Sequence, residues 1–347
     1  MMRILVVSDA WHPQVNGVVR TLESLRGRLE TEGHQVEMIT PDRFRSIPCP
    51  SYPEIRLALK PGRKLSRLIE AAQPCAIHIA TEGPLGWAAR RYCVKRQLPF
   101  TTAYHTRFPE YIRARWRVPL PISYAVMRRF HRPSSTIMVA TQNIEDELVR
   151  RGFRNIARWG RGVDTTLFRP RPEAKGDHGP FAGLPRPVHL YVGRVAVEKN
   201  VEAFLALDLP GSKVVVGDGP QLDELKKRYP AATFTGAKTG EDLATHYAAA
   251  DLFVFPSRTD TFGLVLLEAL ASGLPVAAYP VPGPLDVIGA SGAGVLSEDL
   301  GQAARNALAI PPELCRAYAL TFSWQASTRQ FVDNLSPFEA KRWMRAA

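Results

Sequence analysis

Two stretches of this chain each begin a series of short apolar runs that alternate with helical patterns. RILVVSD, from residue 3, is followed by apolar residues at helical spacing up to Gly33 and then by QVEMIT. VHLYVG, from residue 188, is followed by KVVVGDGP, ATFTG, DLFVFPS and PVAAYP. Apolar strands separated by helices are typical of parallel sheets that carry helices on both faces. The sequence therefore predicts an α/β fold with two Rossmann-like domains.

A stretch rich in proline and glycine separates the two series. Residues 168–187 contain five prolines and three glycines, a composition that favours a linker. A length of 347 residues also suits two domains. We expect a first domain over residues 1–168, a linker over 169–187 and a second domain over 188–321.

The charge of the chain is concentrated in its first half. Residues 1–180 contain 30 Lys and Arg against 16 Asp and Glu, a net charge of +14, whereas residues 181–347 contain 15 against 17. A basic domain joined to a nearly neutral one indicates a polyanionic partner, either nucleic acid or an anionic membrane. The four cysteines form no C-x-x-C pair, and neither a spanning apolar segment nor a signal peptide is evident. These features favour a cytoplasmic protein.

Charged residues follow two predicted strands of the second domain. Arg194 and Lys199, in GRVAVEKN, come after VHLYV, and Asp260 comes after DLFVFP. The carboxyl ends of parallel strands are where such sheets bind ligands. A helix is expected from about Thr261 to Ser272, so that free amides near Phe262 and Gly263 could bind phosphate. Glu268 would lie inside that helix, where a buried carboxylate needs partners.

Each of these features alone has a simpler explanation. Arg194 and Lys199 could be a solvated loop pair, and Glu268 could form an ion pair between helices. Their occurrence together at one expected crevice favours ligand binding. Neither domain contains G-x-G-x-x-G, which argues against a nicotinamide cofactor, and the chain has no D-x-D for a metal-bound diphosphate. We therefore expect no cofactor and no metal.

The motifs of the second half resemble those of a known family. GRVAVEKN, VVVGDGP and DLFVFPSRTDTFGLVLLEALASGLPV are similar to the retaining, nucleotide-sugar-dependent glycosyltransferases of GT-B architecture, whose signature is two acids eight residues apart. The resemblance implies two facing Rossmann-like domains, with the donor bound mainly by the second and the acceptor by the first. It also implies a C-terminal helix, within residues 322–347, that returns to the first domain.

The resemblance further implies roles for the donor-site residues. Arg194 and Lys199 would bind the diphosphate, Glu268 would hold the ribose, and Asp260 would contact the sugar hydroxyls. The family usually has Glu at the position of Asp260, which affects the identity of the donor sugar. The base would be recognised near FTGAKTG, which includes Gly236 and Lys238.

Two residues of the first domain complete the set that the resemblance implies. Gly17 would let the backbone approach the phosphates, although it could equally be an ordinary turn glycine. His105, which follows a predicted strand, would lie beside the donor sugar, whereas a lone histidine at such a place is usually structural. Retention in this family is attributed to attack on the same face of the sugar, with the leaving phosphate oxygen taking the acceptor proton. No dedicated general base would then be needed.

The basic segment over residues 107–132 contains seven arginines, one glutamate and several aromatic residues. Such a composition suits an interfacial segment on an anionic bilayer; a solvated charged surface is the alternative. No known nucleic-acid-binding module accompanies the charge, so no nucleic acid partner is expected. The candidate membrane-binding residues are Arg113, Arg115, Trp116, Arg117, Arg128 and Arg129.

The string SRTDTFGLVLLEALASGLPVAAYPVPGPLDV looks most similar to bacterial enzymes that glycosylate diacylglycerol, with the GDP-mannose-dependent mannosyltransferases of lipid carriers close behind. This resemblance and the basic segment together predict the function. We expect transfer of a hexose or hexuronic acid from a UDP-sugar to a membrane lipid, diacylglycerol being favoured, on the cytoplasmic face of the cell membrane. A GDP-mannose-dependent α-mannosyltransferase acting on a lipid or polysaccharide is the closest alternative. A nucleotide-sugar epimerase and a non-catalytic membrane-binding protein are alternatives of other classes.

Overall fold

Two compact units make up the chain. The computed structural model describes residues 1–14, 16–49, 52–260 and 262–339. Residues 1–160 and 324–347 cluster as the first unit, and residues 161–323 as the second. The stretch predicted as a linker, 169–187, falls within the second unit, where Pro172–Lys175 forms the short 3-10 helix η2.

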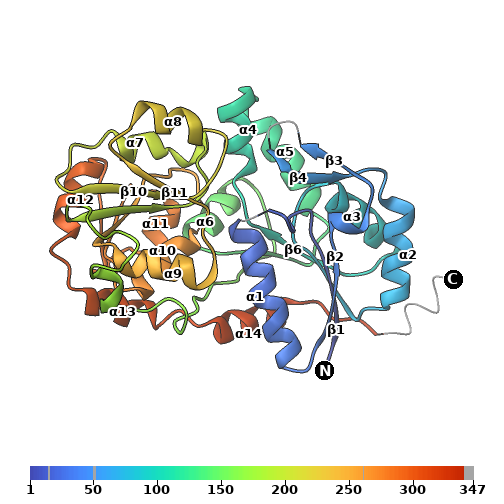
Figure 1. Ribbon diagram of the computed structural model, residues 1–347. Helices are drawn as coiled ribbons and strands as arrows, with labels where there is room; N and C mark the ends of the chain where they lie inside the picture. The colour runs from blue at the N-terminus through green and yellow to red at the C-terminus, as the bar shows by residue number, and fades with distance from the viewer. Residues whose placement is uncertain (15, 50–51, 261, 340–347) are drawn as a thin grey trace. The chain divides into compact units, whose positions relative to one another are not determined.

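A six-stranded parallel sheet forms the centre of the first unit (Figure 1). Its strand order is β2-β1-β5-β6-β7-β8. The strands are β1 (Arg3–Val7), β2 (Gln35–Ile39), β5 (Ala76–Ile79), β6 (Thr101–Tyr104), β7 (Thr136–Val139) and β8 (Ile156–Arg158). The chain turns from one side of β1 to the other between β2 and β5, which makes the gap between β1 and β5 the topological switch point of this sheet.

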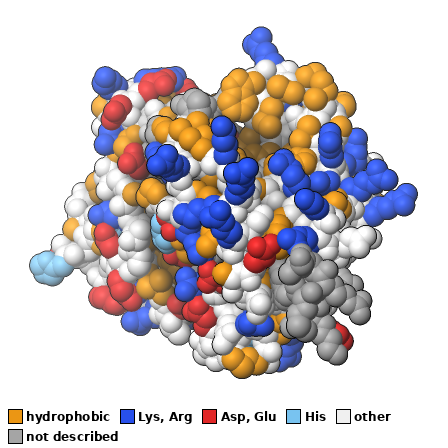
Figure 2. Space-filling view, turned by 90° about the vertical axis from the view of Figure 1, so that its right-hand side faces the viewer, with side chains coloured by type: hydrophobic (Ala, Val, Ile, Leu, Met, Phe, Trp, Pro, Cys, Tyr) orange, Lys and Arg blue, Asp and Glu red, His pale blue; other side chains and the backbone are white. Residues whose placement is uncertain are grey.

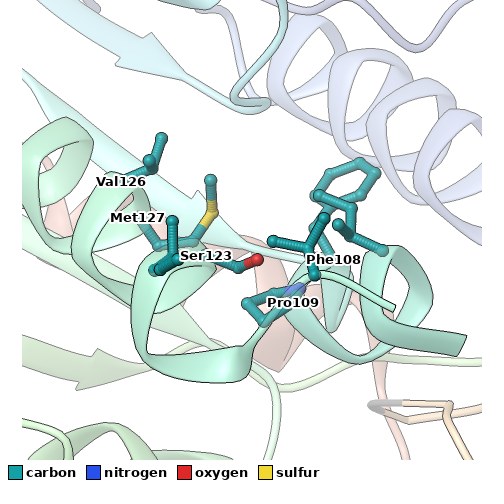
Figure 3. Close-up of a pocket in the computed structure, with 8 residues that line it drawn as sticks. Phe108, Pro109, Ser123, Val126 and Met127 are labelled. Atoms are coloured by element: carbon teal, nitrogen blue, oxygen red, sulfur yellow. The ribbon is translucent and has the colours of Figure 1, made fainter. Parts of the chain in front are cut away.

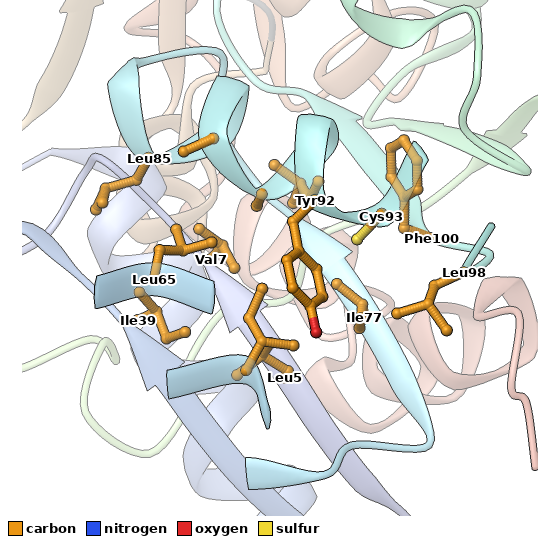
Figure 4. Packing of buried hydrophobic residues seen from close by; sticks show 14 of the residues in the cluster. Leu5, Val7, Ile39, Leu65, Ile77, Leu85, Tyr92, Cys93, Leu98 and Phe100 are labelled. Carbon is orange, nitrogen blue, oxygen red and sulfur yellow. The ribbon is translucent and has the colours of Figure 1, made fainter. Parts of the chain in front are cut away.

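Side chains of the first sheet alternate between two apolar layers. Leu5 and Val7 pack with Leu65 of α2 and Leu85 of α3 (Figure 4). Ile4, from the same strand, belongs to the opposite layer, together with residues of α1 and α14. Because successive residues of a strand point to opposite faces, a strand that is apolar throughout can be buried on both sides. The predicted helix-covered parallel sheet is confirmed.

The C-terminal helix of the chain belongs to the first unit. The helices of this unit are α1 (Gly17–Thr31), α2 (Gly62–Ala72), α3 (Pro84–Arg96), α4 (Phe108–Trp116), α5 (Leu120–His131), α6 (Gln142–Arg150) and α14 (Trp324–Asn334). The C-terminal helix α14 packs against α1, and Asn334 Nδ2 donates to the Arg158 carbonyl at 2.8 Å. A C-terminal helix that joins the first domain is therefore confirmed, with a shorter helical span than 322–347. Residues 340–347 of the predicted span lie outside the described part of the chain.

A small antiparallel hairpin interrupts the alternation after β2. It consists of β3 (Ser46–Cys49) and β4 (Tyr52–Ala58), and it follows the 3-10 helix η1 (Pro41–Arg43). The sequence patterns did not indicate this hairpin. Its prolines at positions 48 and 53 weaken a strand pattern, because proline cannot donate a ladder hydrogen bond.

The second unit has its own six-stranded parallel sheet. Its order is β11-β10-β9-β12-β13-β14, the strand order of dinucleotide-binding folds. The strands are β9 (Val188–Val192), β10 (Ser212–Val216), β11 (Thr233–Gly236), β12 (Leu252–Phe255), β13 (Val276–Ala278) and β14 (Gly294–Leu296). Strands β9 and β12 are neighbours, and the strand order reverses between them. The switch point of this sheet therefore lies beyond their carboxyl ends.

Short helices cover the second sheet. They are η3 (Val197–Lys199), α7 (Val201–Leu205), α8 (Leu222–Arg228), α9 (Gly240–Ala249), α10 (Leu264–Ala271), α11 (Pro282–Val287), α12 (Leu300–Ala307) and α13 (Pro312–Ala319). Every strand that the second-half motifs predicted is present. The described helix α10 begins at Leu264, later than the predicted start near Thr261, which itself lies outside the described residues. Gly263 has a φ of 85°, a left-handed conformation that cannot belong to a right-handed helix.

Candidate active site

Two of the charged residues predicted to share a crevice, Lys199 and Asp260, meet at the switch point of the second sheet. Arg194 and Lys199 follow β9, and Asp260 follows β12. Lys199 Nζ forms an ion pair with Asp260 Oδ1, and both side chains are largely buried, with exposed fractions of 22% and 17%. The structure thus brings together two charges that are 61 residues apart in the sequence.

The pairing leaves part of the Asp260 carboxylate available. Asp260 Oδ2 is buried and makes no hydrogen bond to any residue that the structure describes. A buried carboxylate oxygen without a donor is costly, because it has lost water without gaining a partner. An incoming hydroxyl group could supply the missing donor.

Backbone contacts hold the two loops in place. Asn200 Nδ2 donates to the Pro256 carbonyl at 3.1 Å, and Thr259 Oγ1 donates to the Glu198 carbonyl at 3.1 Å. The Tyr191 hydroxyl donates to the Arg194 carbonyl at 2.7 Å. The positions of Arg194 and Lys199 are therefore fixed by the loops that carry them.

The VGDG motif after β10 packs tightly on the same loop. Gly217 has a φ of 152°, and a Cβ there would lie 1.8 Å from the Gly193 carbonyl oxygen. Gly219 has a φ of 157°, and its Cβ would lie 2.4 Å from the Val195 carbonyl oxygen. Only glycine permits this approach, so VVVGDGP supports the loop that carries Arg194.

Glu268 has a partner that the sequence did not reveal. It lies in α10 with 6% of its surface exposed, and the Tyr247 hydroxyl of α9 donates to Glu268 Oε2 at 2.9 Å. The expectation that a buried carboxylate here needs a hydrogen-bond donor is therefore met by a tyrosine. Tyr247 could have been suspected only as a buried polar residue on the apolar face of α9.

The predicted base-recognition residues Gly236 and Lys238 lie at and just after the carboxyl end of β11, the strand at one side of the sheet. Gly236 ends the edge strand β11 with a φ of 74°. Lys238 forms an ion pair at 3.0 Å with Asp242, in the first turn of α9. Phe262 is 8% exposed and Gly263 precedes α10. The roles of these four residues toward a donor stay predictions.

Gly17 and His105 belong to the first unit. Gly17 is the first residue of α1, and the preceding Asn16 caps that helix, its Oδ1 accepting from the Val18 and Val19 amides at 3.0 Å each. His105 follows β6, and its ring packs edge-on against Trp159 at 5.6 Å between centroids. A turn glycine and a packed histidine both fit this description, so their proposed roles toward the donor also stay predictions.

A buried carboxylate occupies the switch point of the first sheet. Asp9 follows β1, and its two carboxylate oxygens accept hydrogen bonds from the amides of Leu85 at 2.8 Å and Gly86 at 3.1 Å, at the start of α3. The Thr81 hydroxyl donates to Asp9 Oδ2 at 3.0 Å. Burial nevertheless raises the pKa of Asp9 to about 6 against the lowering effect of these hydrogen bonds. The sequence gave no sign of this contact.

The basic segment over residues 107–132 forms α4 and α5. Arg113, Trp116, Arg117 and Arg129 are exposed, whereas Arg128 is half-buried and donates to the Arg151 carbonyl at 3.1 Å. The side chain of Arg115 lies outside the described part of the structure. Figure 2 shows Lys and Arg side chains gathered over the upper part of one face, beside hydrophobic side chains.

Arg107, one of the seven arginines of the basic segment, is largely buried. It therefore does not contribute to a charged surface, contrary to what the sequence had suggested. Arg107 Nη2 pairs with Glu147 at 2.7 Å, and both side chains are about 15% exposed. The Tyr124 hydroxyl donates to Glu110 at 2.8 Å, and Arg151 pairs with Glu147 at 2.9 Å. Burial acts to raise the pKa of Glu147, but the charge of Arg107 and the hydrogen bonds that Glu147 accepts from Arg151, Tyr124 and Arg107 outweigh it, so the pKa is lowered. This network joins α4, α5 and α6.

Comparisons with known proteins identify the family. The first part of the chain, residues 15–167, matches Glycosyltransferase Family 4, and residues 186–310 match Glycosyl transferases group 1. A GDP-mannose-dependent alpha-mannosyltransferase of Mycobacterium tuberculosis is 30% identical over 85% of this chain and 83% of its own length. An alpha-monoglucosyldiacylglycerol synthase of Streptococcus pneumoniae is 28% identical over 90% of this chain and 80% of its own length. The chain belongs to this glycosyltransferase family.

Solved structures agree on the fold. The structure of HepE from Anabaena in complex with UDP and glucose superimposes with a TM-score of 0.73, at 17% identity, over 96% of this chain and 99% of that chain. The fold is the GT-B type, with two parallel-sheet domains of six strands each. Among the described residues, no helix has the length and apolar character needed to span a bilayer. No three His, Cys, Asp or Glu side chains of the described part come together as metal ligands.

Proposed function

We propose that this glycosyltransferase moves a hexose or hexuronic acid from a UDP-sugar to a membrane lipid, with diacylglycerol as the favoured acceptor, and that it retains the anomeric configuration. The observation that carries the donor part is the ion pair of Lys199 with Asp260 at the switch point of the second sheet. A cation and a carboxylate oxygen without a donor at one sheet edge, followed by a buried glutamate in the next helix, suit a sugar joined to a diphosphate.

The cations would stabilise the leaving group. When the bond between the anomeric carbon and the diphosphate oxygen breaks, negative charge grows on that oxygen. Lys199 and Arg194, held by the loop after β9, would offset this charge, and no metal ion is needed in the proposed mechanism. Lys199 would exchange its contact with Asp260 for the phosphate when the donor binds.

The carboxylates would orient the donor. Asp260, released from Lys199, would accept hydrogen bonds from sugar hydroxyls, and its buried Oδ2 supports this role. Glu268, oriented by the Tyr247 hydroxyl, would accept from the ribose hydroxyls. Asp is one methylene shorter than Glu, so the sugar would sit closer to the loop after β12 than it does with Glu at this position.

The transfer itself would need no base from the protein. The acceptor hydroxyl oxygen attacks the anomeric carbon on the face from which the diphosphate leaves. The hydroxyl proton passes to the departing diphosphate oxygen, so that atoms and charge balance. Gly17, at the start of α1, and His105, directly after β6, both in the first unit, would line the donor side of this reaction.

The basic, partly apolar surface of α4 and α5 supports a lipid acceptor. Exposed Arg113 and Arg129 lie on α4 and α5, and exposed Arg117 directly follows Trp116, the last residue of α4, which is 59% exposed. Each cation near an anionic bilayer contributes about 1 kcal/mol to binding. The protein would thus act at the cytoplasmic membrane surface, and the similarity to a glucosyldiacylglycerol synthase supports this acceptor.

A GDP-mannose donor is a second candidate. The mannosyltransferase of M. tuberculosis has the higher identity, 30% against 28% for the glucosyldiacylglycerol synthase. The residues around Gly236 and Lys238, which we propose to contact the base, do not by themselves favour uracil over guanine.

One experiment separates these candidates. The purified protein is mixed with anionic vesicles that contain diacylglycerol and, in separate reactions, with UDP-glucose, UDP-glucuronate, UDP-galactose or GDP-mannose, and the lipids are analysed by mass spectrometry. We expect a glycosylated diacylglycerol with one UDP-sugar. If glycolipid forms only in the reaction with GDP-mannose, the second candidate is correct. If a donor is consumed but no glycolipid forms, the lipid acceptor is ruled out.

Variants of the donor site test the proposed roles. Lys199→Ala and Glu268→Ala should each lower kcat/KM by an amount equivalent to about 3 kcal/mol, since each removes a charged contact to the donor. Lys226→Ala, on the exposed side of α8, is the matched control and should leave kcat/KM unchanged. Near-normal activity of both site variants would show that the site lies elsewhere.

A further inference from the structure

A cavity of about 190 Å³ lies between α4 and α5 of the first unit (Figure 3). Its lining is almost entirely apolar and is formed by Phe108, Pro109, Ile112, Val118, Ile122, Ser123, Val126 and Met127. A water molecule occupies about 30 Å³ in the liquid, so the cavity has room for roughly six groups of that size. That is too small for a whole nucleotide sugar or lipid, whose pockets usually have volumes of about 300 Å³ or more. It suits part of an alkyl chain.

One polar group in this lining has no partner. Ser123 is 7% exposed, and its Oγ is buried without a hydrogen bond to any described residue. Figure 3 shows the Ser123 hydroxyl turned toward the space between the two helices. A buried hydroxyl without a partner costs free energy. A ligand that brings one acceptor oxygen among apolar atoms would remove that cost, and the ester carbonyl of an acyl chain is such an oxygen.

The mouth of the cavity is apolar, and two exposed arginines lie next to its lining residues in the sequence. Phe108, Ile122 and Val126 are 38%, 58% and 46% exposed, so the lining continues onto the surface. Exposed Arg113 directly follows Ile112 in α4, and exposed Arg117 directly precedes Val118. The single glutamate of the segment, Glu110, is 17% exposed and is held by Arg107, Arg151 and Tyr124, so it does not neutralise these arginines. These sequence neighbours of the lining would supply positive charge to an anionic headgroup.

We infer that the cavity between α4 and α5 binds one acyl chain of an anionic glycerolipid, with Ser123 donating to its ester carbonyl and the neighbouring arginines pairing with its headgroup. This inference deepens the proposed action on membrane lipids and rests on it for its biological setting. A buried chain would fix the depth and orientation of the first unit at the bilayer, which a purely electrostatic surface cannot do. Each methylene buried in the cavity would increase affinity about fourfold.

Photochemical labelling tests the inference without any glycosyl transfer. The probe is dioctanoyl phosphatidylglycerol with a diazirine in one chain, used below the concentration at which it forms micelles. After irradiation and trypsin digestion, label is expected in the peptides 108–113 and 118–128. Excess unlabelled dioctanoyl phosphatidylglycerol should compete, whereas the same headgroup without acyl chains should not. Label spread evenly over the chain would overturn the inference.

Two variants and a control make the result specific. Ser123→Leu fills the cavity, and Ile122→Asp places a carboxylate at its exposed mouth, where the fold should tolerate it. Each should lower labelling of the two peptides at least fivefold. Val149→Asp, an equally exposed aliphatic position on α6 outside the cavity, should label like the unchanged protein. Unchanged labelling of Ile122→Asp would overturn the inference even if Ser123→Leu failed to fold.

The outcomes also separate this inference from the proposed function. Thermal stabilisation by UDP reports the second unit and should persist in Ile122→Asp. If the cavity is labelled but the protein forms no glycolipid, the lipid site in the cavity is supported and the proposed transfer to a lipid acceptor is wrong. Glycolipid formation with no labelled cavity would reject the cavity alone. Dimers that form without lipid and disappear in Ile122→Asp would identify a second copy of the chain as the occupant instead.

Discussion

The buried Asp9 carboxylate should make the first unit less stable as the pH rises through weakly acidic values. Burial raises its pKa in the folded protein to about 6, from 3.8 for an unperturbed aspartate. Between these two values the folded state binds more protons than the unfolded state, so the free energy of unfolding falls as the pH rises. The difference of about 2 pKa units corresponds to about 3 kcal/mol, lost between about pH 4 and pH 6.

Asp9→Asn isolates this effect, because asparagine keeps the shape of the side chain but does not titrate. One asparagine oxygen can still accept from the Leu85 amide, but its NH₂ group would face the Gly86 amide, which also donates. The free energy of unfolding of the variant should therefore depend less on pH. It should be about 1–3 kcal/mol lower than that of the unchanged protein with Asp9 protonated.

Urea unfolding followed by tryptophan fluorescence is a suitable assay. Every tryptophan of the chain belongs to the first unit, since residues 161–323 contain none. The free energy of unfolding is measured for both proteins from pH 4 to pH 7, and other titrating groups cancel in the difference. The stability of the unchanged protein relative to Asp9→Asn should fall by about 2.4 kcal/mol over this range, because part of the full change lies below pH 4. A constant difference, or one that rises with pH, would show that the hydrogen bonds outweigh burial and would refute the reasoning.

Three further predictions concern other buried contacts. Tyr247→Phe should lower the free energy of unfolding by about 1.5–3 kcal/mol and raise the KM for the donor, because the lost hydroxyl donates to the Glu268 carboxylate. Tyr318→Phe is the control, because its hydroxyl donates to a neutral carbonyl. It should lower the free energy of unfolding by about 1 kcal/mol and leave KM unchanged. Equal effects of the two on KM would contradict a positioning role for Tyr247. Gly83→Ala should unfold at lower urea concentration than the unchanged protein, because its Cβ would lie 2.4 Å from Asp9 Cγ. Glu147→Gln should cost about 3 kcal/mol by removing the shorter of the two buried ion pairs of Arg107 and leaving only the 3.8 Å contact with Glu110, and a melting temperature equal to that of the unchanged protein would count against it.

Much of the fold followed from local patterns. The strands β1, β2, β5, β6 and β9 to β13 coincide with apolar runs that the sequence displays directly. A strand buried on both faces is apolar at most positions, and that composition can be seen without knowledge of its neighbours. β7, β8 and β14 and the hairpin β3–β4 were not anticipated. β8 and β14 have only three residues each, too few for a periodic pattern to emerge.

Local patterns also predicted part of the candidate site. Arg194, Lys199 and Asp260 could be placed at one sheet edge, because residues that follow parallel strands lie at the carboxyl ends of those strands. That rule concerns the backbone and says nothing of partners. The ion pair between Lys199 and Asp260, and the hydroxyl of Tyr247 on Glu268, depend on how loops and helices far apart in the sequence pack.

By itself, the sequence determined the class of fold, the family and the edge of the second sheet where the charges lie, because strand periodicity, glycine-rich turns and motif spacing are local properties. Only the tertiary structure decided which charges are internal. It turned Arg107 and Glu110 inward, buried Asp9 against the start of α3, and formed between α4 and α5 an open apolar cavity, in whose described lining the Ser123 hydroxyl has no hydrogen-bond partner. These outcomes depend on contacts between residues distant in the chain, and the burial that results sets the free energy of each charge.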